Sequence, residues 1–145
     1  MKYRLLLLAM LTASALTSLA QNEKKAIPPV AAKTAFEKAF PGAEKVKWGK
    51  EKAGYEVNFS LKGKQMAAVY DNNGIAKETE EDIKIAALPS LVTSYIKTHY
   101  ANAAIKEAAK ITKAGGEINY EAEVNKKDLI FDVNGKFIRE EKDED

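Results

Sequence analysis

Two short stretches, Tyr70-Asp71-Asn72-Asn73-Gly74 and Phe131-Asp132-Val133-Asn134-Gly135, decide the fold. Each contains an aromatic residue, an aspartate, one variable residue and the pair Asn-Gly, and β-forming residues precede each one. Asn-Gly tolerates positive φ at both central positions of a turn, so it is the strongest short-range signal for a β-hairpin. Because the stretch returns 61 positions later, the sequence predicts one unit that is built twice.

The chain around the first stretch predicts a helix followed by four antiparallel strands. Ile27-Pro28-Pro29 opens the helix, and Phe40-Pro41-Gly42 ends it, since proline is tolerated in a first turn and disfavours helical geometry in the residue before it. The apolar stripe of this helix is Val30, Ala32 (or Ala31), Phe36, Ala39 and Phe40. The four expected strands are 46–48, 55–61, 65–70 and a segment from 75 onward, joined by turns.

The second half repeats this order. Leu88-Pro89-Ser90 opens a helix in the same way as the first prolines do. Its apolar stripe is Val92, Tyr95, Ile96, His99 and Tyr100. The strands expected after it are 105–112, 118–124, 129–133 and 136–139.

These patterns predict an α+β fold that consists of a tandem repeat of a helix plus a four-stranded antiparallel meander. The repeats would occupy residues 27–87 and 88–139 and pack as one domain, in one curved sheet of about eight strands with both helices on one face. The acidic run 78–82 is interpreted as a solvated strand end and linker, and the acidic tail 140–145 as a frayed, solvated end.

The N-terminal segment has the features of a secretory signal peptide. Lys2 and Arg4 precede an apolar run, Leu5 to Leu19, and small residues lead to a cleavage site after Ala20. The alternative is an uncleaved membrane anchor. Residues 21–26 would then form a disordered leader. Export predicts a periplasmic or secreted protein without a membrane span after cleavage.

The composition excludes several classes of function. The formal net charge of +2 comes from Lys2 and Arg4, so the rest of the chain is neutral and lacks the positive surplus of a nucleic-acid binder. The chain has one histidine and no cysteine, which argues against zinc and against a nucleophilic catalytic constellation. It has no glycine-rich phosphate loop either. The prediction is a protein that is not an enzyme and needs no cofactor or metal.

Four sets of residues each have a functional and a structural interpretation. His99 is interpreted as a packed or partly exposed helix residue rather than a catalytic one. Trp48 is either core packing against the first helix or an exposed anchor of a binding surface. The third set comprises the turn residues, which are either calcium ligands or simple turn formers: Asp71, Asn73, Asp132 and Asn134. The fourth set is Glu121 with Glu123, which are either an acid–base catalytic pair or residues on the solvent-exposed side of a sheet.

The chain resembles the PepSY-like family, also called β-lactamase-inhibitor-like. The resemblance lies in segments 27–43, 46–48, 54–57 and 70–74, and it returns in the second half at Leu88-Pro89, 120–124 and 131–135. It implies a small exported bacterial protein with a tandem α+β repeat, a curved sheet and helices on the convex side. The family name suggests inhibition of a β-lactamase or a protease, but the resemblance implies no established activity, and no inhibitory residue maps onto this chain by position.

The sequence therefore predicts an exported binding module whose uncovered sheet face binds a protein or peptide, with an inhibitory or regulatory effect on that partner. The alternative is an envelope protein that binds or senses a small molecule or an ion. The predicted face is polar and of mixed charge, and its candidate binding residues are Lys47, Glu56, Asn58, Lys106, Lys110, Asn119, Glu121 and Glu123. Its exposed edges could also pair two copies of the chain.

Overall fold

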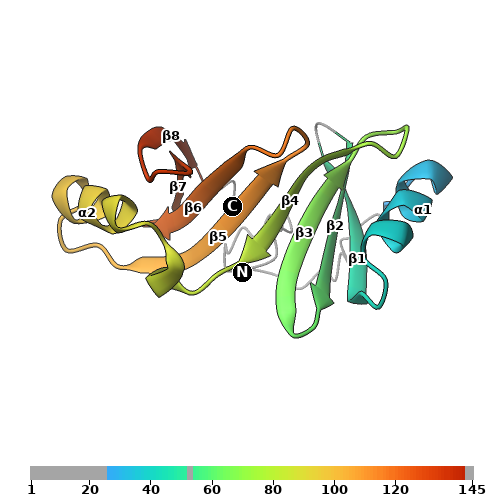
Figure 1. Cartoon of the computed structure of the whole chain (residues 1–145), viewed down its shortest axis with the longest axis horizontal. Helices are drawn as coiled ribbons and strands as arrows, with labels where there is room; N and C mark the ends of the chain where they lie inside the picture. The colour runs from blue at the N-terminus through green and yellow to red at the C-terminus, as the bar shows by residue number, and fades with distance from the viewer. Residues whose placement is uncertain (1–25, 52–53, 143–145) are drawn as a thin grey trace, which may run out of the picture.

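The computed structural model describes residues 26–51 and 54–142. One curved, open sheet of eight antiparallel strands runs in sequence order, and two helices pack on it (Figure 1). The elements are α1 (Val30–Ala39), β1 (Glu44–Glu51), β2 (Gly54–Leu61), β3 (Lys64–Tyr70), β4 (Ala76–Asp82), the 3-10 turn η1 (Ile85–Ala87), α2 (Ser90–His99), β5 (Ile105–Lys113), β6 (Ile118–Val124), β7 (Lys127–Asp132) and β8 (Phe137–Lys142). The α+β class and the eight-stranded curved sheet are confirmed.

The predicted signal peptide lies outside the described residues, as does most of the predicted leader. In the part of the chain that is described, neither helix is long and apolar enough to cross a membrane.

Helix α1 buries two side chains against the first four strands. Pro29 stands at its N-cap, and Ala32 and Phe36 are buried, whereas Val30 is 82% exposed. The buried stripe therefore begins at Ala32, two residues later than predicted, and Ala39 is exposed as well. The Phe36 ring meets the rings of Phe59 at 4.9 Å and Trp48 at 5.5 Å between centroids, so the core-packing interpretation of Trp48 is confirmed.

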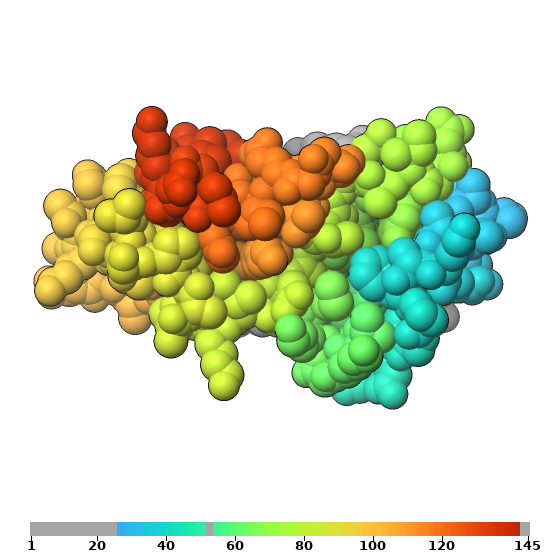
Figure 2. Space-filling model, in the orientation of Figure 1, coloured from blue at the N-terminus to red at the C-terminus, as the bar shows by residue number. Residues whose placement is uncertain are grey.

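Helix α2 forms a second, separate core with the last four strands. Val92 and Ile96 are its buried residues, and they pack with Ala122, Leu129 and Phe131. The two helices lie at opposite ends of the sheet, with the middle strands between them (Figures 1 and 2). Each half of the chain thus has its own hydrophobic cluster.

The strand register places both helices on the same face. A row of cross-strand neighbours runs from Phe59 to Phe131. The Phe59 ring contacts Phe36 of α1, and the Phe131 ring contacts Tyr95 of α2. The neighbours between them are Met66, Glu81, Lys110 and Tyr120. Directly opposite residues share a face of a sheet, so this face carries both helices, as predicted.

The two Asn-Gly stretches form turns, but of a different type from the one expected. Only the glycines adopt positive φ, +80° at Gly74 and +85° at Gly135. Asp71 Oδ1 accepts hydrogen bonds from the backbone N–H groups of Asn73 and Ile75, both at 2.9 Å. The aspartate therefore organises a longer turn that is closed by one left-handed glycine. Two-residue turns with positive φ at both positions occur instead at Lys62-Gly63 and at Asn125-Lys126.

Two acidic segments were assigned incorrectly from the sequence. The run 78–82 belongs to β4, a central strand of the sheet, and is no linker. In the predicted tail, Glu140 and Glu141 are part of β8, while 143–145 lie outside the described residues. Both errors arise because acidic side chains are poor strand signals, whereas pairing with neighbouring strands overrides local propensity.

A hydrogen-bonded cluster fixes the β8 edge to the end of α2. The Tyr100 hydroxyl donates to Glu140 Oε2 at 2.5 Å, and Lys127 Nζ donates to Glu140 Oε1 at 2.7 Å. The hydrogen bond to the Glu140 carboxylate raises the pKa of Tyr100 to about 12. Because this pKa lies above the value of about 10 in an unfolded chain, the bond stabilises the fold fully at neutral pH and loses its effect as pH rises through 12.

We expect the stability difference between the wild-type protein and Tyr100→Phe to stay constant up to about pH 9 and to shrink between about pH 10 and 12. Urea unfolding at a series of pH values measures it, and ultraviolet difference absorbance of the two proteins follows the Tyr100 ionisation itself. In Glu140→Gln, the pKa of Tyr100 should move back toward the ordinary tyrosine range. A Tyr100 that ionises at the same pH in both backgrounds would contradict the assigned cause.

Candidate functional site

The sheet surface opposite the helices is the candidate site, and we call it the polar face. Its central row of directly opposed residues crosses seven strands. The row runs Lys47, Asn58, Ala67, Glu80, Ile111, Asn119 and Asp132. Among residues 26–51 and 54–142, no helix packs on this face, because both helices lie on the other one.

Six of the eight predicted binding residues lie on the polar face. They are Lys47, Glu56, Asn58, Asn119, Glu121 and Glu123. Lys106 lies at an irregularity of β5, and its Nζ reaches within 4.0 Å of Glu123 Oε1.

Lys110 was placed on the wrong face. It is directly opposite Tyr120, which packs against the α2 cluster, and opposite Glu81 on the other side. The irregularity between Ile105 and Glu107 shifts the alternation of β5 by one residue. Such a shift moves every following side chain to the opposite face, so Lys110 belongs to the helix side.

The polar face is acidic rather than of mixed charge, because it also carries carboxylates that sequence reasoning missed. They come from β1, β4, β5, β7 and β8 and are Glu51, Glu78, Glu80, Asp82, Glu107, Asp128, Asp132 and Glu141. The basic residues on the same rows are Lys47, Lys113 and Arg139, and Lys77 and Lys106 reach this face from irregularities of β4 and β5. The alternation of Glu78, Glu80 and Asp82 was the available signal, and it would have been found if the run had been read as a strand.

The centre of this face is not the wet surface that the sequence suggested. Glu56, Glu80 and Glu121 are only 7%, 7% and 9% exposed, and Asn119 is 3% exposed. A side chain in the middle of a wide sheet has neighbours on both adjoining strands and along its own strand. Charges there act in a medium of lower effective dielectric than water, which strengthens their interaction with an opposite charge.

Asn119 has an unusual environment on this face. Its Oδ1 atom is buried and accepts no hydrogen bond from the described residues. Asn58, which lies on β2 in the same cross-strand row, instead donates from Nδ2 to Glu56 Oε2 at 3.2 Å. A buried acceptor without a donor costs free energy, so Asn119 Oδ1 is the one polar atom described on this face that calls for an external donor.

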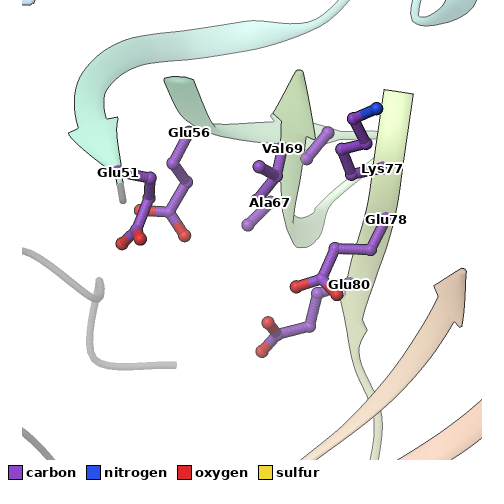
Figure 3. Close-up of a pocket in the computed structure, with 8 residues that line it drawn as sticks. Glu51, Glu56, Ala67, Val69, Lys77, Glu78 and Glu80 are labelled. Atoms are coloured by element: carbon purple, nitrogen blue, oxygen red, sulfur yellow. The ribbon is translucent and has the colours of Figure 1, made fainter. Parts of the chain in front are cut away.

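A hollow of about 170 Å³ opens on the polar face between β2 and β4. Glu51 and Glu56 point toward it from one side and Glu78 and Glu80 from the other, with the small side chains of Ala67 and Val69 between them (Figure 3). At about 30 Å³ per water molecule, this space corresponds to about six waters, or to the polar head of one side chain. Lys77 also lines the hollow (Figure 3), and Lys113 Nζ donates a hydrogen bond to Glu78 Oε2. Four carboxylates still outnumber these cations, so the wall favours a hydrogen-bond donor or a further positive charge.

The remaining candidates have structural roles. The His99 ring stacks on Tyr95 at 4.0 Å between centroids, and its Nδ1 lies 3.0 Å from the Tyr95 carbonyl oxygen. Asp71 Oδ2 pairs with Lys77 Nζ at 2.9 Å, and this pair together with the turn hydrogen bonds lowers the pKa of Asp71. Within the described part of the chain, no group of three or more histidine, cysteine, aspartate or glutamate residues has the geometry to hold a metal ion.

The geometry of the sheet agrees with the result of a family comparison. The family model described as "Putative beta-lactamase-inhibitor-like, PepSY-like" matches residues 53–139. The chain belongs to this family. The resemblance inferred from segments in both halves of the chain is thereby confirmed, and segments 27–43 and 46–48 lie outside the matched residues. No curated protein matches the sequence of this PepSY-like protein.

Three crystal structures from Bacteroides species have a similar fold. A protein of Bacteroides eggerthii, described as "putative periplasmic", has a TM-score of 0.72 at 15% identity, over 80% of this chain and 89% of that chain. A DUF2874 family protein of Bacteroides ovatus has a TM-score of 0.70 at 19% identity, over 83% and 91%. A BLIP-like protein of Bacteroides fragilis has a TM-score of 0.61 at 24% identity, over 80% and 87%. At such identities the likeness shows the shared fold alone.

Proposed function

We propose that this PepSY-like protein is an exported, non-catalytic binding module and that its polar face binds a segment of another protein. The observation that carries the proposal is the polar face itself, an eight-stranded surface whose rows of acidic and amide side chains face away from both helices. A sheet face of this width offers the area that a specific protein interface needs. A regulatory or inhibitory effect on the partner would follow from covering the partner's own site.

The sequence prediction that the protein is not an enzyme is retained as part of this proposal. Glu121 and Glu123 are the residues considered for acid–base catalysis, and they alternate along β6 on the polar face. In the described part of the chain, the hollow on this face is lined by β1 to β4 and does not include either residue. A pair of catalytic carboxylates needs a substrate pocket between or beside them, so binding explains this surface better than catalysis does.

We further propose that the two halves arose by duplication of one helix-plus-meander unit. The ends of α1 and α2 have the same backbone geometry, with φ −126° and ψ 63° at both Phe40 and Tyr100. The aspartate of each Asn-Gly turn also accepts the same two backbone hydrogen bonds. An evolutionary origin of this kind supports a module in which both halves contribute to one binding surface.

The proposal predicts selective loss of a partner from variants of the polar face. The exported protein, immobilised after processing by an expression host, should retain a partner from native envelope extract, and Glu80→Lys should lose that partner. Glu81→Lys is the matched control, because Glu81 is the next residue of β4 and points to the helix face. Charge reversal on a recognition surface weakens binding through like-charge contacts.

Mass spectrometry of the retained proteins and circular dichroism of the baits are the two measurements. Retention of the same protein by wild type and Glu81→Lys, with loss in Glu80→Lys, is the expected result. A folded wild-type bait that retains nothing, or equal loss in both variants, would contradict binding through the polar face.

A further inference from the structure

Asn119 and the row around it point to a particular kind of ligand. Its Oδ1 atom is buried and lacks a donor among the described residues, and its side chain lies on the polar face, since the neighbouring Tyr120 packs on the helix side. Directly opposite Asn119 lie Ile111 on β5 and Asp132 on β7. The next residue of the row beyond Ile111 is Glu80. An orphaned acceptor between carboxylates is suited to a group that both donates hydrogen bonds and carries positive charge.

We infer that the polar face binds a basic, extended segment of a partner protein, with arginine side chains seated at Asn119 and in the hollow lined by Glu56 and Glu80. The inference rests on the proposed function, since it names the chemistry of the partner for the same face. It adds a ligand class and two subsites to that proposal.

The negative charge of the polar face favours a positively charged partner. Carboxylates occur on every row of the polar face, and those of β4 and β6 lie away from both edges of the sheet. One row consists of Glu107, Glu123, Asp128 and Glu141, four acidic residues directly opposite one another on successive strands. Like charges in such positions repel. Lys106 Nζ lies 4.0 Å from Glu123 Oε1 and Arg139 Nε donates to Glu141 Oε1 at 2.7 Å, so cations of the chain already offset part of this charge, and a bound cationic segment would add to their effect. This negative field also attracts basic partners and increases their rate of association.

The apolar residues beside the carboxylates favour arginine over a small cation. Ile111 lies directly opposite Glu80 and Asn119, and Ile130 lies directly opposite Glu121. Arginine has an aliphatic stem that packs on such side chains and a planar head with five N–H donors. The head can donate to the Asn119 amide oxygen and to a carboxylate at the same time, which the compact lysine ammonium does less well.

The distance between the two subsites matches the repeat of an extended peptide. Ala67, which lines the hollow, lies on β3 and Asn119 lies on β6. These strands are three spacings apart, or about 14 Å. In an extended chain, residues four positions apart point to the same side and are separated by about 13 Å. A segment with arginines at positions i and i+4 that crosses the strands therefore reaches both subsites.

The test uses a nine-residue peptide with arginine at positions 1, 5 and 9 and alanine elsewhere, titrated into the exported protein by calorimetry. The comparison peptide has citrulline, the neutral isostere of arginine, at the same three positions. We expect the citrulline peptide to bind at least about tenfold more weakly, since hydrogen bonds to a charged group contribute more than neutral ones. The affinity of the arginine peptide should also fall as salt is raised.

Three protein variants locate the binding. Asn119→Leu removes the amide acceptor at similar volume, and Glu80→Gln removes one charge of the hollow; each should lower the affinity about tenfold. Glu81→Gln, on the opposite face of the same strand, should bind within about twofold of wild type. Circular dichroism melts confirm that each variant is folded, and Glu80→Gln keeps the test decisive if Asn119→Leu does not fold.

Several results would overturn the inference. They are equal binding of the two peptides, unchanged affinity in the folded Asn119→Leu and Glu80→Gln variants, an equal loss in Glu81→Gln, and spermine binding as tightly as the arginine peptide. If the arginine peptide does not bind although the envelope extract yields a partner that depends on Glu80, the inference is wrong and the proposed function stands. If neither is seen, both are wrong.

Discussion

Replacing Phe36 with alanine is expected to lower the free energy of unfolding by about 3–5 kcal/mol. Phe36 is 3% exposed, and its ring is in contact distance of four other aromatic rings, those of Phe40, Trp48, Phe59 and Tyr70. It is also the largest side chain that α1 buries in the sheet. Its removal leaves a cavity at the centre of the first core, where loss of transfer free energy and loss of packing add up.

Denaturant unfolding measures this effect with two probes. Circular dichroism reports the whole fold, while the fluorescence of Trp48, the only tryptophan, reports the first core. Val30→Ala is the control on the same helix, because Val30 is 82% exposed and its truncation should change stability by no more than about 0.5 kcal/mol. A loss below about 1 kcal/mol in Phe36→Ala would show that α1 contributes little to the fold.

The second large effect is expected from Gly74→Ala, which should cost more than about 2 kcal/mol. Gly74 has φ +80°, where a side chain costs about 1–2 kcal/mol. A Cβ atom at this position would also lie 2.5 Å from the Ala31 carbonyl oxygen and 2.7 Å from its carbonyl carbon. Backbone atoms of a helix cannot move away as a flexible side chain can, so the turn or α1 must shift.

Gly63→Ala is the matched control for this substitution. Gly63 has almost the same φ, +79°, but a Cβ atom there meets nothing within 4 Å. The control should therefore lose only the conformational part, about 1–2 kcal/mol. Thermal or denaturant unfolding of both variants gives the difference, which isolates the contact between the turn and α1. Equal losses in the two variants would contradict a close approach at Gly74.

The order of elements could be predicted because several local signals agreed. The prolines before each helix, the alternation of Tyr55, Val57 and Phe59, and the Asn-Gly turns all indicated the same meander. The strand at 46–48 was expected to be short, whereas β1 extends over Glu44–Glu51. The strand is longer because its backbone pairs with β2. The mixed charged and aromatic residues of this segment do not indicate that pairing.

The candidate site was harder to predict than the fold. Glu121 and Asn119 were assigned to the polar face because β6 alternates regularly. Lys110 was assigned to it wrongly, since an irregularity of β5 leaves no mark in the sequence. Glu80 was missed because a charged residue is an unusual occupant of a buried central strand. The acidic character of the polar face depends on where Glu80, Lys110 and their cross-strand neighbours lie. Those neighbours follow from the strand register, which the sequence does not show.

The separation of the two cores has a mechanical consequence. Between them, β4 and β5 are joined by backbone pairing and by polar contacts such as the hydrogen bond from Lys113 Nζ to Glu78 Oε2. Interdigitated side chains resist deformation because any movement opens voids, whereas a strand pair bends or twists through small changes in its dihedral angles. The molecule is therefore most compliant along its midline. We expect the two halves to move as relatively rigid units about β4 and β5. The curvature of the sheet can then change to fit a bound partner.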